Sequence, residues 1–210
     1  MKKIINKILY YGVQTIEYYF SLVIDKIRRV DFAKKVDTKV PGGEIYEATH
    51  RWMIVALSRY LKENIVLDDA IIDVGCGKGA MLRLFTKFPF KKITGLEYSE
   101  KLSNIANNNM KRLGIEDRCG IINIDAGIFD MYSEYNYFYL YNPFGESVME
   151  LFLTQVKSSL DRKPRKIVII YNNPVCGDMM VNSGFYEKED LADLMGKNYK
   201  LKSIKIYSNC

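Results

Sequence analysis

A run of ten residues, Ala70 to Gly79, constrains the fold of this chain more than any other stretch. It opens with apolar and β-branched residues, as a buried strand does, and it ends with Gly75, Gly77 and Gly79 at every second position. Helix-forming residues follow it. The run therefore predicts a strand, a glycine turn and a helix start, where a ligand can approach the backbone closely and meet unpaired N–H groups.

Two classes of ligand use such a turn. Gly75, Gly77 and Ala80 satisfy the dinucleotide-binding fingerprint G-x-G-x-x-G/A. Asp73 precedes the first glycine by two residues, where a carboxylate brings no benefit to a pyrophosphate. A carboxylate at this position suits a cationic ligand instead.

The spacing of Asp73 and the three glycines resembles the first motif of the class I S-adenosylmethionine-dependent methyltransferases. In that family the acid lies near the methionine amino group of the cofactor, and the glycines pass beneath it. The resemblance implies that Asp73, Gly75 and Gly77 hold the methionine half of S-adenosylmethionine, with Cys76 and Gly79 also in contact. A tight turn that binds no ligand is the alternative.

Length, cysteine and histidine content limit the function class. The 210 residues suffice for one α/β domain with a large core. The four cysteines have no paired spacing, which argues against a zinc site or a disulfide framework and favours a reducing, cytoplasmic environment. Because His50 is the only histidine, we expect no metal site and no Ser-His-Asp or Cys-His catalysis.

The net charge of +6 is concentrated at the N-terminus. Residues 1–39 carry nine Lys or Arg against four Asp or Glu, whereas the remaining 22 basic and 21 acidic residues nearly cancel. We therefore expect a basic, amphipathic helical extension over residues 1–39 and a cofactor-binding domain over residues 40–210.

Residues 2–30 are predicted to form one long amphipathic helix. Gln14 and Glu17 interrupt its apolar stretch, so it is neither a transmembrane span nor a secretory signal. Such a helix more often packs on its domain, and the alternative is contact with a membrane surface through its basic ends and tyrosines. Its apolar residues recur at spacings of three, four or seven: Ile5, Leu9, Ile16, Phe20, Val23, Ile27 and Val30.

Tyr46 and Glu47 stand just before a helix that is predicted to end near Leu61. The functional interpretation places both over the mouth of the cofactor site as contributors to catalysis. The alternative is that Glu47 or Thr49 caps this helix.

The next two predicted strands each have an acid at the carboxyl end or directly after it. Strand 91–97 ends at Glu97, 22 residues after Gly75, with the spacing and chemistry of a carboxylate that accepts from both ribose hydroxyls. Tyr98 is placed to lie along the adenine face. After strand 120–124, Asp125 can accept from the adenine amino group while the backbone N–H of Ala126 contacts the ring. A simple turn at Asp125 remains the alternative.

The fourth strand, over residues 137–141, is followed by Asn142, Pro143 and Phe144. One proline short, this run resembles the (Asn/Asp/Ser)-Pro-Pro-(aromatic) motif of amino-methylating enzymes. The resemblance implies that Asn142 and the Pro143 carbonyl accept from a target amine and that Phe144 stacks on the substrate. The alternatives are a plain turn and a core position for Phe144.

A helix over 147–160, a buried strand over 166–171 and an alternating, half-exposed strand over 201–207 complete the predicted elements. The last strand is expected to be antiparallel and to lie at the edge of the sheet. The predicted fold class is α/β, with a doubly wound, mostly parallel sheet of six or seven strands and an N-terminal helical extension. Polar residues follow each parallel strand at its carboxyl end, where open α/β sheets bind ligands.

Over residues 37–186 the chain resembles a small bacterial type of class I methyltransferase. The resemblance implies methyl transfer from S-adenosylmethionine to a nucleophile. The Asn-Pro-Phe turn favours a nitrogen atom as this nucleophile. The substrate, whether small molecule, protein side chain or nucleic acid, and the oligomeric state are not specified by the sequence. The alternatives are an NAD(P)-dependent oxidoreductase, supported by the fingerprint and Glu97, and a non-catalytic, membrane-peripheral cofactor-binding module.

Overall fold

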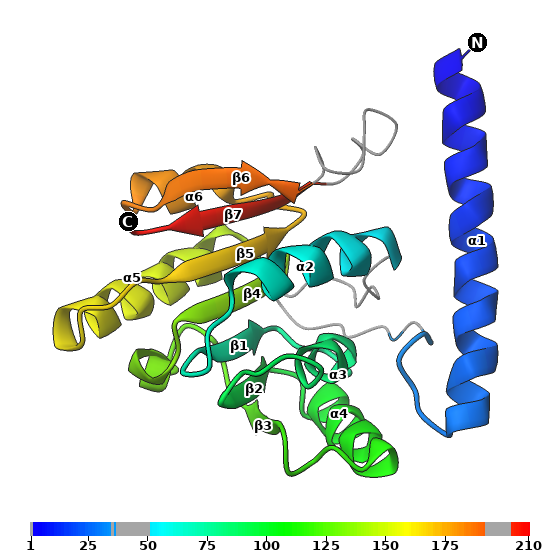
Figure 1. Cartoon of the computed structure of the whole chain (residues 1–210), viewed down its shortest axis with the longest axis horizontal. Helices are drawn as coiled ribbons and strands as arrows, with labels where there is room; N and C mark the ends of the chain where they lie inside the picture. The colour runs from blue at the N-terminus through cyan, green and yellow to red at the C-terminus, as the bar shows by residue number, and fades with distance from the viewer. Residues whose placement is uncertain (1, 35, 37–50, 192–202) are drawn as a thin grey trace.

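The computed structural model describes residues 2–34, 36, 51–191 and 203–210 (Figure 1). The strands are β1 Ala70–Val74, β2 Lys92–Glu97, β3 Gly120–Asn123, β4 Tyr137–Tyr141, β5 Val168–Asn172, β6 Tyr186–Asp190 and β7 Ile204–Ser208. The helices are α1 Lys2–Arg28, α2 Arg51–Asn64, α3 Ala80–Phe85, α4 Glu100–Leu113, α5 Glu146–Arg162 and α6 Gly177–Asn182, with a short 3-10 helix at Met131–Glu134.

The strands form one sheet in the order β3-β2-β1-β4-β5-β7-β6. Strands β1 to β5 pair in parallel, and β7 is antiparallel to both of its neighbours. Side chains of α2, α3 and α4 pack on one face of the sheet, and those of α5 and α6 pack on the other. The predicted doubly wound, mostly parallel sheet is confirmed.

The last strand is antiparallel, as predicted, but its predicted place at the edge of the sheet is wrong. β7 lies between β5 and β6, so Ile204, Ile206 and Tyr207 are buried. The edge on this side of the sheet is β6, a charged strand whose side chains are mostly exposed. Charged residues suit an edge because they discourage pairing with other chains, and their lack of an apolar pattern hid this strand in the sequence.

The predicted glycine turn and the ends of α4 follow from local backbone preferences. Gly75, Gly77 and Gly79 all have positive φ, of 81°, 54° and 80°, which other residues rarely adopt. Ser99 caps the start of α4 by accepting from the N–H of Leu102, and Gly114 ends the helix at φ 64°.

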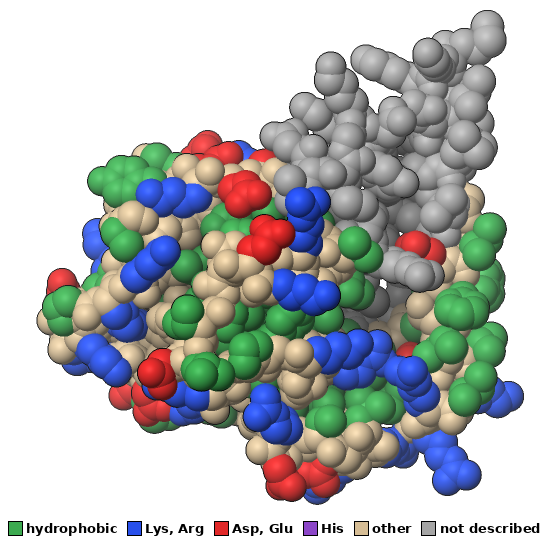
Figure 2. Space-filling model, in the orientation of Figure 1, with side chains coloured by type: hydrophobic (Ala, Val, Ile, Leu, Met, Phe, Trp, Pro, Cys, Tyr) green, Lys and Arg blue, Asp and Glu red, His purple; other side chains and the backbone are tan. Residues whose placement is uncertain are grey.

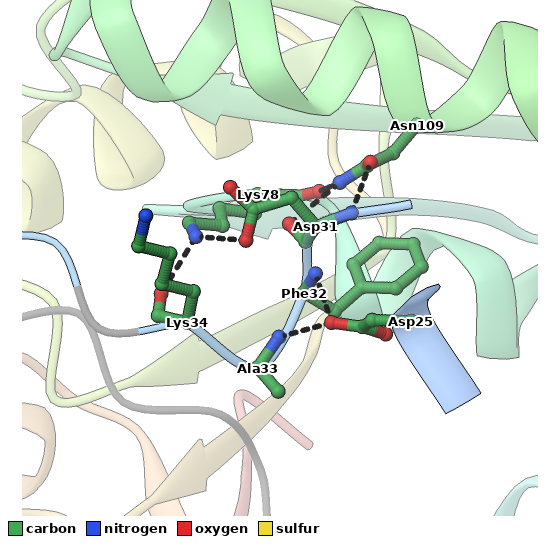
Figure 3. A network of polar contacts seen from close by, with 7 residues as sticks. All are labelled: Asp25, Asp31, Phe32, Ala33, Lys34, Lys78 and Asn109. Atoms are coloured by element: carbon green, nitrogen blue, oxygen red, sulfur yellow. Dashed lines mark hydrogen bonds and ion pairs between the residues drawn. The ribbon is translucent and has the colours of Figure 1, made fainter. Parts of the chain in front are cut away.

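The residues after α1 are fixed to the glycine turn by a polar network (Figure 3). The fully buried Lys78 donates from Nζ to Asp31 Oδ1 at 2.5 Å and to the Lys34 carbonyl at 2.6 Å. The side-chain oxygen of Asn109 accepts from the N–H of Asp31, and its NH₂ group donates to the carbonyls of Asp31 and Lys78. Val30 and Phe32 join the core on the α2–α4 face. The start of the chain is thereby tied to the loop that precedes α3.

Replacing Lys78 by methionine keeps the buried stem but removes the donor to Asp31 and Lys34. Because the side chain of Asp31 is 36% exposed and can be rehydrated, we expect the free energy of unfolding to fall by about 1–3 kcal/mol in urea titrations. Lys91→Met is the control, since Lys91 pairs at 3.9 Å with an almost fully exposed Asp68, and it should change the stability by less than about 0.5 kcal/mol. Equal effects of the two changes would contradict the anchoring role of Lys78.

Candidate cofactor and acceptor site

The carboxyl ends of β1, β2 and β4 meet at one edge of the sheet. A Cβ atom on Gly75 would lie 2.5 Å from Cβ of Pro143, so the turns after β1 and β4 are in direct contact. The N–H groups of Gly75 and Cys76 donate to the Leu96 carbonyl at 2.9 and 2.8 Å, which joins the same turn to the end of β2. The structure therefore brings together three motifs that lie far apart in the sequence.

Cys76 is buried against Gly95 of β2. A Cβ atom on Gly95 would lie 2.6 Å from Cys76 Sγ, so the glycine makes room for the thiol. Burial, with a smaller effect of the nearby Asp73 and Glu97, raises the pKa of Cys76 well above its usual value. A neutral, buried thiol is a poor nucleophile. Contact of Cys76 with a cofactor stays a prediction.

Asp73 has the most unusual environment of the predicted site residues. Its side chain is 2% exposed, and Oδ2 has no hydrogen-bond partner among the described residues. Burial, and to a smaller extent the negative charge of Glu97, raises the pKa of Asp73 well above its usual value. A buried carboxylate in this state needs a proton or a cationic partner. This environment suits a ligand that carries an ammonium group.

Glu97 links the glycine turn to the start of α4. Its Oε2 accepts from the N–H of Gly77 and its Oε1 from the N–H of Ser99, both at 2.8 Å. Burial raises the pKa of Glu97, and these N–H donors partly oppose the shift. Each carboxylate oxygen can accept a second hydrogen bond, so the group retains capacity for ligand hydroxyls. Tyr98 beside it is exposed.

Asp125 starts a turn, which is the alternative to adenine binding that the sequence left open. Its Oδ1 accepts from the N–H of Gly127 at 2.7 Å. This bond does not use Oδ2. Ala126 is buried, and its carbonyl accepts from the hydroxyl of Tyr132 at 2.8 Å. A role for Asp125 and Ala126 in adenine binding stays a prediction.

In the Asn-Pro-Phe turn, Asn142 and Pro143 lie at the sheet edge, whereas Phe144 lies in the core. Asn142 has a φ of 37°, a conformation that asparagine tolerates better than most residues, and both Asn142 and Pro143 are half-buried. Phe144 is 7% exposed and packs against Phe152, with ring centroids 6.1 Å apart. The structure thus places the Phe144 ring in the core, one of the two positions open from the sequence.

Sequence reasoning gave no role to Asn172, the last residue of β5. Its side chain is fully buried, and its Nδ2 lies 3.2 Å from the hydroxyl of Tyr139 and 3.3 Å from Sδ of Met53. Its Oδ1 has no hydrogen-bond partner within the described part of the chain. Asp73 pairs in register with Tyr139, and Asn172 pairs with Tyr141 two residues further on. Because side chains alternate along strands, Asp73, Tyr139 and Asn172 lie on the same face of the sheet. The sequence signal that could have indicated Asn172 is the polar cluster 172–174, directly after the predicted buried strand 166–171.

Two predicted catalytic residues, Tyr46 and Glu47, lie outside the described residues. Within the ranges that the structure describes, no three His, Cys, Asp or Glu side chains form a group that could hold a metal ion.

Comparison with known proteins relates part of this chain to methyltransferases. Residues 72–138, from β1 into β4, match the family model described as a methyltransferase domain. An RNA methyltransferase from Salinibacter ruber, solved in complex with S-adenosyl-L-homocysteine, has a similar fold with a TM-score of 0.53 and 15% identity over 77% of this chain and 93% of that chain. The fold, together with the match of residues 72–138 to a methyltransferase domain, therefore supports a class I methyltransferase.

The curated relatives include enzymes with different named substrates. The chain is 21% identical over 126 residues to the ribosomal protein L11 methyltransferase of Thermotoga neapolitana. The aligned region covers 57% of this chain and 46% of that protein. It is 30% identical over 76 residues to human EEF1A lysine methyltransferase 2. The aligned region covers 36% of this chain and 29% of that protein. The chain therefore spans less than half the length of these relatives.

The sheet also argues against the alternative of a nicotinamide-dependent oxidoreductase. The dinucleotide-binding fold has the strand order 3-2-1-4-5-6. Here the antiparallel β7 is inserted between β5 and β6. The match of residues 72–138 to a methyltransferase domain points the same way.

Replacing Asp73 by asparagine tests whether the carboxylate is unpaired in the ligand-free protein. Because its pKa is raised in the folded state, Asp73 favours folding at low pH and disfavours it as the pH rises through the folded-state pKa. We expect Asp73→Asn to stabilise the ligand-free protein by about 1–2 kcal/mol at neutral pH and to lose this advantage in acid, as measured by thermal unfolding at several pH values.

Asp69→Asn is the matched control for this change. Asp69 is also buried, but its oxygens accept from the N–H of Val66 and from Asn136 Nδ2, so its replacement should bring no gain. A loss of stability at neutral pH in Asp73→Asn would show that Asp73 has a partner in the ligand-free protein.

Proposed function

We propose that this protein is an S-adenosylmethionine-dependent methyltransferase that transfers the methyl group to a nitrogen nucleophile. The observation that carries the proposal is the buried carboxylate of Asp73, whose Oδ2 has no partner among the described residues. It lies where the glycine turn and a second acid converge. An ammonium group next to Asp73 would compensate both its burial and the repulsion from Glu97.

The residues of the sheet edge fit the parts of this cofactor. Asp73 and the backbone of Gly75 and Gly77 would hold the methionine part, with Cys76 and Gly79 completing the turn. Glu97 would accept from the ribose hydroxyls through the free lone pairs of its oxygens. Tyr98, Asp125 and the N–H of Ala126 would contact the adenine. When bound, the cofactor supplies an electrophilic methyl group on a sulfonium.

Residues at the carboxyl ends of β4 and β5 would position the acceptor. Asn142, the Pro143 carbonyl and the Oδ1 of Asn172 would accept hydrogen bonds from the N–H groups of an amine and direct its lone pair toward the glycine turn. Phe144 would anchor the turn from the core. Tyr46 and Glu47 stay proposed contributors at the mouth of the site. Since the leaving group is good, alignment and exclusion of water would be the main contributions of the chain, and the proton would pass to solvent.

The nitrogen acceptor is supported by the carbonyl and amide oxygens at the ends of β4 and β5. The names of the relatives leave the wider substrate open, because one acts on a ribosomal protein and another on a lysine of EEF1A. We propose a substrate with an amine group, whether protein side chain, nucleobase or small molecule.

Binding of the demethylated cofactor product tests the proposed ribose contact. Glu97→Ala removes the buried acceptor of two hydrogen bonds, so it should weaken S-adenosylhomocysteine about a hundredfold in isothermal titration. Glu100→Ala removes an exposed acid three residues later and should bind like the original protein. Unchanged affinity in Glu97→Ala, or tighter binding of NAD than of S-adenosylhomocysteine by the original protein, would refute the assignment.

Transfer of a radiolabelled methyl group tests the role of Asn172. With tritiated S-adenosylmethionine and cell lysate separated into protein, nucleic-acid, lipid and small-molecule fractions, we expect label in one fraction. Asn172→Ala should reduce this incorporation about tenfold and leave S-adenosylhomocysteine affinity unchanged, because the proposed role of Asn172 is to position the acceptor and not the cofactor. Asn182→Ala, at an exposed position, is the control. Incorporation unchanged by Asn172→Ala would remove that residue from the acceptor site.

A further inference from the structure

Over the part of α1 whose side chains the structure describes, the outer face is apolar and exposed. In Figure 1 this helix stands to one side of the sheet, and in Figure 2 apolar side chains gather along its described part on the side away from the domain. Five large apolar side chains on this helix are between 55% and 72% exposed, although the more common outcome expected from the sequence was packing on the domain. We call them the α1 stripe: Ile16, Tyr19, Phe20, Val23 and Ile27.

Hydrogen bonds fix the last turn of α1 and the residues that follow it. Asp25 is 8% exposed, and its Oδ2 accepts from the N–H groups of Phe32 and Ala33 at 2.7 and 2.6 Å. At 100° per residue, Asp25 lies opposite the centre of the α1 stripe. The Arg29 carbonyl also accepts from Arg112 of α4 at 2.5 Å. The end of the helix is thus fixed with its apolar stripe directed outward.

Basic residues stand at both ends of the helix and beside its anchor. Lys2, Lys3 and Lys7 are in its first two turns, and Lys26 and Arg28 are in its last turn. Glu17 and Asp25 are its only acids, and Asp25 is buried. On the domain, the Arg83 guanidinium lies 5.3 Å from the centre of the Phe32 ring, and its pKa is lowered by burial and by the charge of Arg28. Positive charge therefore accumulates around the end of α1.

We propose that the α1 stripe docks on the surface of an anionic lipid bilayer, with the helix lying in the plane of the membrane. An apolar face with aromatic residues enters the boundary between headgroups and acyl chains, and basic residues contact anionic headgroups. Among the described helices, none is long and apolar enough to cross a membrane.

A second copy of the chain fits this surface less well than a bilayer does. Because both ends of α1 are basic, parallel and antiparallel pairs of the helix would each bring like charges together. A nucleic acid would satisfy the basic residues but would leave the apolar stripe in water. An anionic bilayer satisfies both features.

Co-sedimentation of the full chain with vesicles tests this proposal. The probes are vesicles of phosphatidylcholine alone and vesicles that also contain phosphatidylglycerol. We expect the protein to pellet with the anionic vesicles, and the double variant Phe20→Gln, Ile27→Gln to partition about tenfold less. Lys26→Gln with Arg28→Gln should weaken binding to anionic vesicles and bring it close to the level on neutral ones.

The matched control replaces two apolar residues that are equally exposed but lie outside α1. Leu67→Gln with Ile128→Gln should bind vesicles like the original chain. Thermal unfolding of every variant should be unchanged, since the altered side chains are exposed. Equal pelleting of the original protein and the stripe variant would overturn the proposal. So would a dimer in sedimentation velocity that Phe20→Gln with Ile27→Gln dissociates, because a second copy would then cover the stripe.

Discussion

Two buried carboxylates at the ends of neighbouring strands dominate the energetics of this protein's sheet edge. Glu97 is partly stabilised by the N–H groups of Gly77 and Ser99, whereas the Oδ2 of Asp73 has no donor among the described residues. Their mutual repulsion adds to the cost of burial. A fold retains such an arrangement at the expense of stability where a ligand completes it, which is a common property of functional sites.

Close backbone contacts hold these acids in place. Gly75 lets the turn after β1 touch Pro143 after β4, and Gly95 lets Cys76 pack on β2. Lys78, in the same turn, binds Asp31 and so ties the segment after α1 to the domain. The proposed cofactor site, the proposed acceptor site and the proposed membrane-docking helix are therefore all attached to one short loop.

Much of the sheet could be predicted because its parallel strands are short apolar runs followed by polar residues. The strands β1, β2, β4 and β5 were predicted in this way. β6 could not be, because its charged residues have no apolar period. The insertion of β7 beside β5 depends on pairing between segments more than thirty residues apart, which no local pattern records.

The sequence alone determined the glycine turn, the acids near the carboxyl ends of β1 and β2 and the amphipathic pattern of α1, because backbone preference and apolar period are properties of adjacent residues. Only the tertiary structure decided that Phe144 belongs to the core, that Asn172 shares a face of the sheet with Asp73, and that the apolar stripe of α1 stays uncovered. These outcomes depend on which distant segments exclude water from a side chain, and burial of that kind is a property of the packed chain as a whole.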